Sequence, residues 1–294
     1  MNTIVQNGCI ACLLLIGTTT LCQAHPAYPA EDQALISPSP PFSEADADTL
    51  SLPSHSEYEG ALATLLEACR NEGLAIDDLL RDERFTIYEG IADRFRKSAE
   101  RKSINLEEYK QILGFEEKKR RGVDFMRDHA DQLQKAQEKY GIPKYVITAI
   151  IGIESDFGNN IGSYNPFNAY VSMYAVDYRA DFAKAQLLEL LDFAKRKNID
   201  LFELKSSYAG AMSFAQFIPY SLNKWFVGDD IFDMGNNIMS VANYLAYFQQ
   251  RTNNLRTSIL RYNPSGLYAD AVLDLAKEFE TGTTTVNAST TETD

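Results

Sequence analysis

The stretch from Ile142 to Gly158 reads IPKYVITAIIGIESDFG and is the most informative part of the 294-residue chain. Pro143 suits the first turn of a helix, because that turn does not need the amide hydrogen that proline lacks. The residues after it are apolar on nearly every side, so we predict a buried helix that ends near Gly158. Glu154 shares a face of this helix with Ile147 and Ile150. The segment therefore predicts a carboxyl group inside the core.

Glu154 is the candidate acid of this segment. A carboxylate away from water costs free energy unless it is protonated or paired. The last turn of the helix also lies at the negative end of the helix dipole, so both effects are expected to raise the pKa of Glu154, as a proton donor near neutral pH requires. The residues alone leave a structural role open, in which Glu154 pairs with a cation or bonds a loop backbone. Asp156 points to a different face and makes a poor catalytic partner.

Most of the chain has helical periodicity. Apolar residues recur at helical spacing in residues 58–69 and again in residues 238–245. Sustained alternation with hairpin turns, which is typical of strands, is absent from the sequence. We therefore predict an all-α domain over residues 57–280, with an N-terminal helical part at 57–120 and a core at 121–280. The second part is richer in Gly, Tyr, Asn and Pro loops, which more often carry function.

The two ends of the sequence differ from this domain. Residues 10–21 form an apolar run that is too short to span a bilayer, and small residues follow it at cleavage spacing, so we predict a signal peptide over 1–24 and export to the periplasm or cell envelope. The first eight residues lack Lys and Arg, which leaves an uncleaved cytoplasmic tail open, and membrane anchoring through a lipid on Cys22 is a further alternative. Residues 25–56 are Pro/Ser-rich and predict a flexible linker, and the Thr-rich residues 281–294 predict a disordered tail.

Composition excludes several classes of chemistry. The net charge is −13 without a strongly basic face, so we expect no nucleic-acid binding, and residues 118–121 are interpreted as a solvated helix face. After the predicted signal peptide Cys69 is the only cysteine, which leaves too few ligands for a zinc site of the His/Cys type. His129 shares an apolar face with Phe125 and is interpreted as a core-edge residue rather than a catalytic base. We expect a monomeric enzyme without metal or cofactor that uses carboxylates.

Three loop segments suggest a carbohydrate groove. They are NIGSYNPF at 160–167, SYAGAM at 207–212, which leads to Gln216, and YNPS at 262–265. Aromatic rings pack on the apolar faces of sugars, while amide and hydroxyl groups bind sugar hydroxyl and N-acetyl groups. Each segment is weak evidence alone, because buried tyrosines commonly serve the core.

Five segments in order resemble the lytic murein transglycosylase B family (glycoside hydrolase family 103). They are IGIESDFG at 151–158, SYNPFN at 163–168, SYAGAMSFAQFIP at 207–219, SVANYL at 240–245 and YNPSGLY at 262–268. The similarity covers about residues 80–279. It implies a lysozyme-like helical fold and cleavage of the β-1,4 bond between N-acetylmuramic acid (MurNAc) and N-acetylglucosamine (GlcNAc). The product implied by the resemblance carries a 1,6-anhydro ring, and the reaction consumes no water.

The resemblance also implies roles for individual residues. Glu154 matches the catalytic acid, which protonates the glycosidic oxygen and then, as a carboxylate, accepts the proton of the muramyl C6 hydroxyl. One carboxyl group performs both steps, so the second carboxylate of most glycosidases is not required. The matching substrate-binding positions are Ser207, Gln216, Tyr244, Tyr262, Asn263 and Tyr268, with Tyr164 in the first loop and Arg179 as a looser match.

The chain departs from the family pattern at several positions. Asp156 stands where arginine often occurs, Ser213 replaces a usual glycine and Tyr220 a usual serine, so the loop around Gln216 is expected to be reshaped. Residues 225–233 are shortened where some members carry an EF-hand-like calcium loop. The acidic residues there lack the alternating ligand spacing of such a loop. We therefore predict no calcium site, and a helix cap at Asp233.

Two other functions stay open at this point. A muramidase of lysozyme type would use Glu154 as acid and add water, and its products would differ. A non-catalytic peptidoglycan-binding scaffold would keep the groove without the chemistry.

Overall fold

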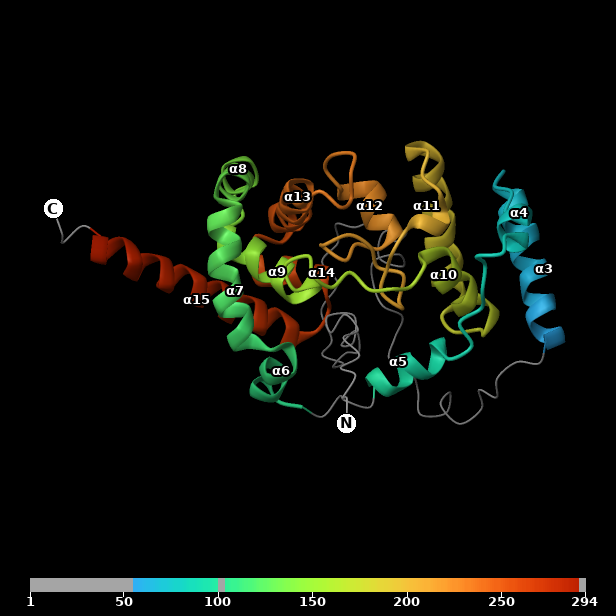
Figure 1. The fold of residues 1–294 in the computed structure, drawn as a ribbon, viewed down its shortest axis with the longest axis horizontal. Coiled ribbons are helices and arrows are strands. Elements are labelled where there is room, and N and C mark those ends of the chain that lie inside the picture. Colours follow the sequence, from blue (N-terminus) through green and yellow to red (C-terminus); the bar gives the residue numbers. More distant parts are fainter. Residues whose placement is uncertain (1–54, 100–103, 291–294) are drawn as a thin grey trace. The chain divides into compact units, whose positions relative to one another are not determined.

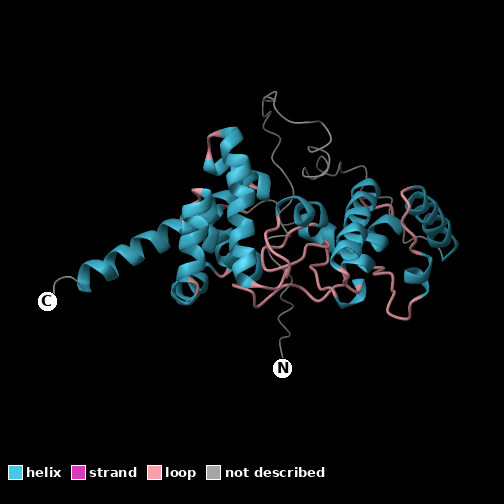
Figure 2. Cartoon of the chain, turned by 90° about the horizontal axis from the view of Figure 1, so that it is seen from above, coloured by secondary structure: helices cyan, strands magenta, loops and turns pink. Residues whose placement is uncertain are grey.

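The computed structural model describes residues 55–99 and 104–290 (Figure 1). The predicted signal peptide and nearly all of the predicted linker lie outside these residues. The described chain forms α-helices, one short 3-10 helix and isolated bridges, and Figure 2 shows helices joined by loops. The predicted all-α class is confirmed. Within this part of the chain, no helix has the length and apolar character needed to cross a membrane.

Backbone contacts divide the chain into two units, which are described separately. The helices of the first unit are α6 (Leu106–Leu113), α7 (Phe115–Asp128), α8 (Ala130–Tyr140), α9 (Lys144–Ser155), α13 (Met234–Thr252), α14 (Leu255–Tyr262) and α15 (Gly266–Thr290). The elements of the second unit are α3 (His55–Asn71), α4 (Asp77–Arg81), α5 (Ile91–Ala99), α10 (Pro166–Ala175), α11 (Ala180–Lys197) and η2 (Leu201–Glu203), and α12 (Pro219–Trp225) ends at the boundary.

Helix α9 is the central helix of the first unit. It packs against α7, α8, α13 and α15, and Ile147, Ile150 and Ile151 are fully buried. The predicted buried helix is therefore confirmed, but its predicted end at Gly158 is wrong. The helix ends at Ser155, because Asp156 adopts a left-handed conformation with φ 52°. Glu154 still lies in the last turn.

Helix α15 changes the prediction for the C-terminal end. Residues from 281 were expected to be disordered, but the helix continues to Thr290. Its earlier turns are anchored by Val272, Leu275 and Phe279, which are at most 2% exposed, and α15 packs against α6, α7 and α9. Extending a formed helix costs little compared with starting one, which accounts for the additional turns.

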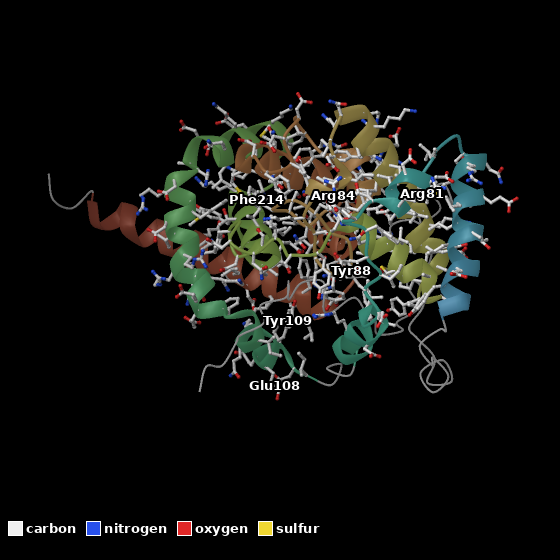
Figure 3. All side chains as sticks on the ribbon, turned by 45° about the vertical axis from the view of Figure 1, so that its right-hand side comes forward. Arg81, Arg84, Tyr88, Glu108, Tyr109 and Phe214 are labelled. Atoms are coloured by element: carbon white, nitrogen blue, oxygen red, sulfur yellow. The ribbon has the colours of Figure 1, made fainter. Side chains whose placement is uncertain are left out.

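The second unit is built around α10. This helix packs against α11, α3, α5 and η2, with Phe167 and Tyr170 fully buried. Asn165 caps α10 through a hydrogen bond from the amide of Asn168, and its own side-chain amide donates to the carbonyl of Leu201 at 2.7 Å. Tyr88, which lies before α5 (Figure 3), accepts a hydrogen bond from the Asn165 amide at 3.0 Å.

The two units do not coincide with the predicted parts at 57–120 and 121–280. Residues 55–99 pack with 161–224, and residues 104–160 pack with 225–290. Helix α7 crosses residue 120 without interruption. Loop composition, on which the prediction rested, carries no information about which distant helices pack together.

Candidate active site

The carboxyl group of Glu154 lies beside the phenol of Tyr268. Glu154 is 5% exposed near the end of α9, and Tyr268 in α15 is fully buried. The hydroxyl group of Tyr268 donates a hydrogen bond to Glu154 Oε1 at 2.7 Å. Glu154 and Tyr268 lie 114 positions apart and were predicted as site residues separately. The fold brings them into contact.

The pKa of Tyr268 shows that the phenol, and not the carboxyl group, donates this hydrogen bond. Burial, followed by the charge of Glu154, raises the pKa of Tyr268 well above its ordinary value. Tyr268 therefore remains a neutral hydrogen-bond donor at physiological pH. Its bond stabilises the carboxylate of Glu154, while burial favours the neutral acid.

Tyr244 and Tyr262 belong to an aromatic cluster in the same unit. The rings of Tyr244 and Tyr262 are 5.0 Å apart, and Trp225 lies 4.8 Å from Tyr244 on another side. The hydroxyl group of Tyr244 donates to the carbonyl of Arg261 at 2.7 Å, and the residue is 3% exposed. Tyr244 therefore supports the end of α14, while Tyr262 is half-buried. The sequence did not single out Trp225 as part of this cluster.

Asn263 shapes the turn that leads to Tyr268. It is 4% exposed, and its Oδ1 accepts a hydrogen bond from the Ser265 amide at 3.1 Å. The hydroxyl group of Ser265 in turn accepts from the Tyr268 amide at 3.3 Å. The YNPSGLY segment thus starts α15 in a defined conformation. The position of Tyr268 follows from this turn.

The loop at 207–219 positions Gln216 in the second unit. Isolated bridges join Ser206 to Met212 and Met212 to Phe217, and the hydroxyl group of Ser207 accepts a hydrogen bond from the Ala211 amide at 3.2 Å. Gln216 is 7% exposed, and its Nε2 donates to the carbonyl of Ser213 at 3.1 Å. Its Oε1 is buried without a hydrogen-bond partner among the described residues. This oxygen is an acceptor that a ligand donor can satisfy.

The substitutions near Gln216 are accommodated locally. Ser213 takes the left-handed conformation expected of the glycine it replaces, with φ 68°, and its hydroxyl group accepts from the Ala215 amide at 3.3 Å. The amide of Tyr220 donates to Gln186 Oε1 at 3.0 Å, and the Tyr220 hydroxyl accepts from Lys224. Ser213 thus has a contact within the loop, and Tyr220 has contacts with α11 and within α12.

Tyr164 and Arg179 also lie in the second unit. Tyr164 is half-buried, and the guanidinium of Arg94 lies over its ring at 5.3 Å. The guanidinium of Arg179 lies 4.0 Å from the centre of the Phe182 ring, and burial lowers the pKa of Arg179. Its buried Nε has no hydrogen-bond partner in the described chain. A desolvated cation of this kind is costly unless an anion binds it.

Sequence reasoning missed the contacts of Asp156. Residues 118–121 were interpreted as a solvated face, but Lys118 is 7% exposed and donates from Nζ to Asp156 Oδ1 at 3.2 Å. Arg121 pairs with the other carboxylate oxygen. The spacing of Lys118 from Phe115 and Phe125, three residues after one and seven before the other, could have placed it on the buried face of α7.

The region of the predicted calcium loop contains a helix cap. Asp233 accepts a hydrogen bond from the Asn236 amide at 2.7 Å, so the predicted cap is confirmed. Across residues 55–99 and 104–290, His, Cys, Asp and Glu side chains form no group of three or more that could hold a metal ion.

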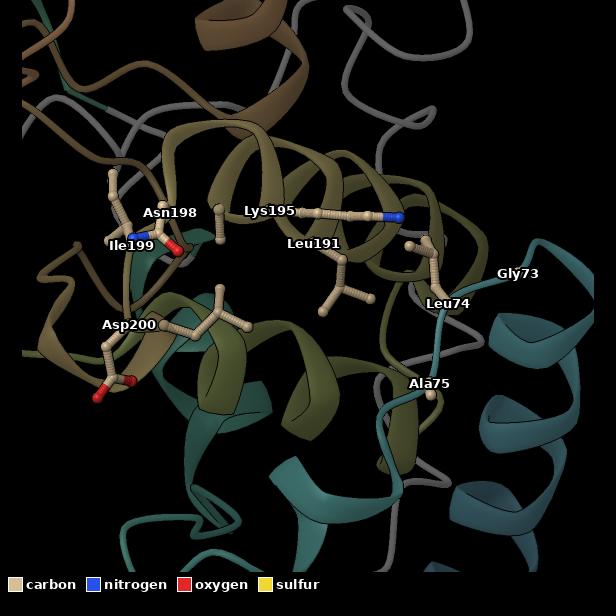
Figure 4. A pocket seen from close by; sticks show the side chains of 10 residues that line it. Gly73, Leu74, Ala75, Leu191, Lys195, Asn198, Ile199 and Asp200 are labelled. Atoms are coloured by element: carbon tan, nitrogen blue, oxygen red, sulfur yellow. The ribbon is translucent and has the colours of Figure 1, made fainter.

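A groove elsewhere in the second unit contains none of the predicted site residues (Figure 4). It runs between residues 73–75 and the C-terminal end of α11, where Lys195 lies. Its acidic residue, Asp200, is paired with Arg84 at 2.7 Å. The groove is therefore separate from the candidate site.

Residues 61–256 match the family described as the transglycosylase SLT domain. The chain belongs to this family. It is 34% identical over 130 residues to membrane-bound lytic murein transglycosylase B of Escherichia coli (strain K12), a match over 42% of this chain and 36% of that protein. The chain thus spans about a third of the length of the curated relative that it matches.

Solved structures show the same fold. Soluble lytic transglycosylase SltB1 of Pseudomonas aeruginosa is similar with a TM-score of 0.66 at 27% identity, over 76% of this chain and 99% of that chain. SltB3 of Pseudomonas aeruginosa, solved in complex with NAG-anhNAM-pentapeptide, has a TM-score of 0.65 at 20% identity, over 76% and 79% of the two chains. The predicted family resemblance and lysozyme-like helical fold are confirmed.

Proposed function

We propose that this protein is a peptidoglycan lytic transglycosylase with Glu154 as its single acid and base. The observation that carries the proposal is the buried Glu154 carboxyl group, which receives a 2.7 Å hydrogen bond from a phenol that stays protonated. Membership of the transglycosylase family supports the reaction class. The substrate is the MurNAc-β-1,4-GlcNAc bond of the glycan strand.

In the first step, neutral Glu154 donates its proton to the glycosidic oxygen. The bond between that oxygen and C1 of MurNAc breaks, and GlcNAc leaves with a free hydroxyl group. The resulting carboxylate is stabilised by the phenol of Tyr268. It then accepts the proton of the C6 hydroxyl as that oxygen bonds to C1, which closes the 1,6-anhydro ring and returns Glu154 to its acid form without water.

The contacts of Asp156 favour a single-carboxyl mechanism. Retaining glycosidases use a second carboxylate as nucleophile about 5–5.5 Å from the acid. Asp156 is the carboxylate next to Glu154 in sequence, but both of its oxygens are engaged by Lys118 and Arg121. It is therefore a structural anion rather than a nucleophile.

The second unit supplies groups that suit a sugar with N-acetyl and acidic substituents. We assign Gln216 Oε1 to accept a hydrogen bond from the substrate, such as one from an N-acetyl amide. Arg179 suits the carboxylate of the muramyl lactyl group or of the stem peptide. The ring of Tyr164 suits an apolar sugar face, and so does the ring of Tyr262 in the first unit. Ser207 holds the loop that carries Gln216. In the first unit, Tyr244 holds the end of α14 and Asn263 holds the turn that leads to Tyr268.

The cellular setting is part of the proposal. The E. coli relative is named as membrane-bound, and SltB3 was solved with NAG-NAM-pentapeptide. We propose that this protein is exported to the periplasm or cell envelope through the segment at 1–24. There it acts on glycan strands as a monomer, without nucleic acid or cofactor.

The test is mass spectrometry of purified peptidoglycan digested by the protein and by its Glu154→Gln variant. Anhydromuropeptides from the wild type alone support the transglycosylase and its acid. Products with reducing ends, heavier by one water, would make the protein a muramidase. Soluble products from neither protein would favour a binding scaffold, and equal activity of the variant would remove Glu154 from the mechanism.

A further inference from the structure

We propose that Asp156, held by Lys118 and Arg121 of α7, is a positioning residue that fixes the Glu154 carboxyl group for proton transfer. The proposal rests on the role assigned to Glu154 above. It concerns the turn at residues 156–158, which directly follows the last helical residue of α9.

The turn begins with two consecutive residues in the left-handed conformation. Asp156 has φ 52° and Phe157 has φ 57°. This conformation is unfavourable for residues that carry a Cβ atom, and more so for phenylalanine than for aspartate. Strained backbone of this kind persists only where the surroundings hold it in place. Contacts from neighbouring residues must therefore hold this turn.

Helix α7 holds Asp156 through three contacts. Lys118 Nζ donates to Asp156 Oδ1 at 3.2 Å, and Arg121 pairs with Oδ2. A second nitrogen of Arg121 donates to the main-chain carbonyl of Asp156 at 3.3 Å. Both side-chain oxygens and the backbone carbonyl are thus bound from one neighbouring helix, which fixes the orientation of the peptide as well as the side chain.

Phe157 folds back onto α9. A Cβ atom placed on Gly152 would lie 2.6 Å from Phe157 Cζ, so the ring occupies the space that a side chain would fill. The ring also packs against Phe125 of α7, with centroids 5.2 Å apart. Glu154 lies midway in sequence between Gly152 and Asp156, so contacts on both sides of it immobilise the end of α9.

Backbone hydrogen bonds complete the closure of the helix. The Asp156 amide donates to the Gly152 carbonyl at 3.1 Å, and the Asn160 amide donates to the Ser155 carbonyl at 2.8 Å. Last turns of helices otherwise fray, because their carbonyl groups have no partners within the helix. A shift of about 1 Å in a catalytic group can cost on the order of 100-fold in rate. Asp156 acts on catalysis through this constraint and does not itself touch the substrate.

The first test variant is Asp156→Asn, because asparagine tolerates the left-handed conformation and has the same shape. It removes the charge that holds Lys118 and Arg121. We measure the initial rate of anhydromuropeptide release at several peptidoglycan concentrations, well below the melting temperature of every variant. The expected result is a fall in kcat of about 10-fold or more with little change in KM.

The second variant, Asp156→Asn with Lys118→Met, separates positioning from stability. It removes the cation that the single substitution leaves buried, so much of the lost stability is expected to return. The kcat is expected to remain low, because the turn is still not held by the charges of α7. Full recovery of kcat in the double variant would overturn the proposal, as would a wild-type kcat in Asp156→Asn.

Asp124→Asn is the matched control. Asp124 also lies on α7 and pairs with Arg127 at 2.8 Å, but both side chains are more than half exposed. Its substitution is expected to leave kcat unchanged. Glu154→Gln is measured in parallel: if this variant keeps activity, the proposed function fails, whereas an inactive Glu154→Gln beside a fully active Asp156→Asn removes only the positioning role.

Discussion

The end of α9 and the loop at 207–219 both contain left-handed residues at or near a candidate site residue, and these are held by different means. At the end of α9, Asp156 and Phe157 are left-handed and are held by side chains of another helix. In the loop, Ser213 and Gln216 are left-handed, and hydrogen bonds within the loop hold them. The first region therefore depends on distant residues, and the second mainly on its own sequence.

This difference decides how each region responds to substitution. Stability lost through a substitution at the end of α9 can be regained by changing a side chain in contact with it. Stability lost through a clash in the backbone around the loop cannot be regained in this way, because the neighbours are main-chain atoms. Substitutions of Gly162 and Gly152 distinguish these two cases directly.

Gly162→Ala is expected to cause the largest loss of stability. Gly162 has φ 85°, and an added Cβ atom would lie 2.1 Å from the carbonyl oxygen of Ser206. Left-handed strain and a clash with main-chain atoms together predict a loss of about 3 kcal/mol. Urea unfolding measures it. A loss below about 1 kcal/mol would show that the backbone beside the loop moves freely.

Gly152→Ala is expected to cost about 2 kcal/mol, because the new Cβ atom meets the ring of Phe157 rather than backbone. The control is the double variant Gly152→Ala with Phe157→Leu, in which a flexible side chain replaces the ring. We expect it to be more stable than Gly152→Ala alone. If the double variant is less stable than either single variant, the two side chains do not compete for the same space.

The difference between local and distant contacts also explains which features could be predicted from the sequence. The buried helix carrying Glu154 and the cap at Asp233 were predictable, because apolar spacing and cap chemistry are local. The loop at 207–219 was recognised as a motif for the same reason. Glu154 and Tyr268 were predicted through two separate family matches, but the bond between them was not predicted, since local periodicity does not show which distant helices meet.

The contacts of Asp156 could not be predicted at all. Lys118 lies within a run of charged residues, and such runs are usually solvated. The spacing of Lys118 could have placed it on the buried face of α7, but only the packing of α7 on α9 shows that an anion lies beside it. The exact end of α9 was missed for a related reason. Gly158 was the better local terminator, but contacts from α7 allow Asp156 to end the helix earlier.

Tyr268→Phe is expected to cost about 1.5 kcal/mol near neutral pH, because it removes a buried hydrogen bond to Glu154. The cost should shrink above pH ~10, the ordinary pKa of tyrosine. In the wild type the raised pKa of Tyr268 keeps the folded phenol protonated while the unfolded one ionises, so stability falls as pH rises through that range. The phenylalanine variant lacks this loss.

Urea unfolding of the wild type and Tyr268→Phe at pH 7 and above pH ~10 checks the prediction. Tyr58→Phe is the control. Burial and the charge of Glu89 also raise the pKa of Tyr58. Unlike Tyr268, however, Tyr58 lies in the second unit and is only partly buried. A stability difference between wild type and Tyr268→Phe that stays constant with pH would mean that Tyr268 ionises equally in the folded and unfolded chains.

Ser213→Gly is expected to have the smallest effect. Glycine removes left-handed strain worth about 1 kcal/mol, but it gains freedom in the unfolded chain worth about 0.5–1 kcal/mol. It also loses the 3.3 Å hydrogen bond from the Ala215 amide. These terms nearly cancel, so the net change should be within about 0.5 kcal/mol. Ser213→Ala keeps the strain and loses the bond, and should therefore cost about 1 kcal/mol.

The two variants of Ser213 test whether the loop at 207–219 holds its own backbone in place. If bonds within the loop hold its backbone, Ser213→Ala is the more harmful change, and neither variant should alter the stability cost of Gly152→Ala in a double-mutant cycle. If glycine instead stabilises the protein by more than about 1 kcal/mol, the strain at Ser213 is not offset by its own hydrogen bond. The loop would then depend on contacts from the rest of its unit, as the end of α9 depends on α7.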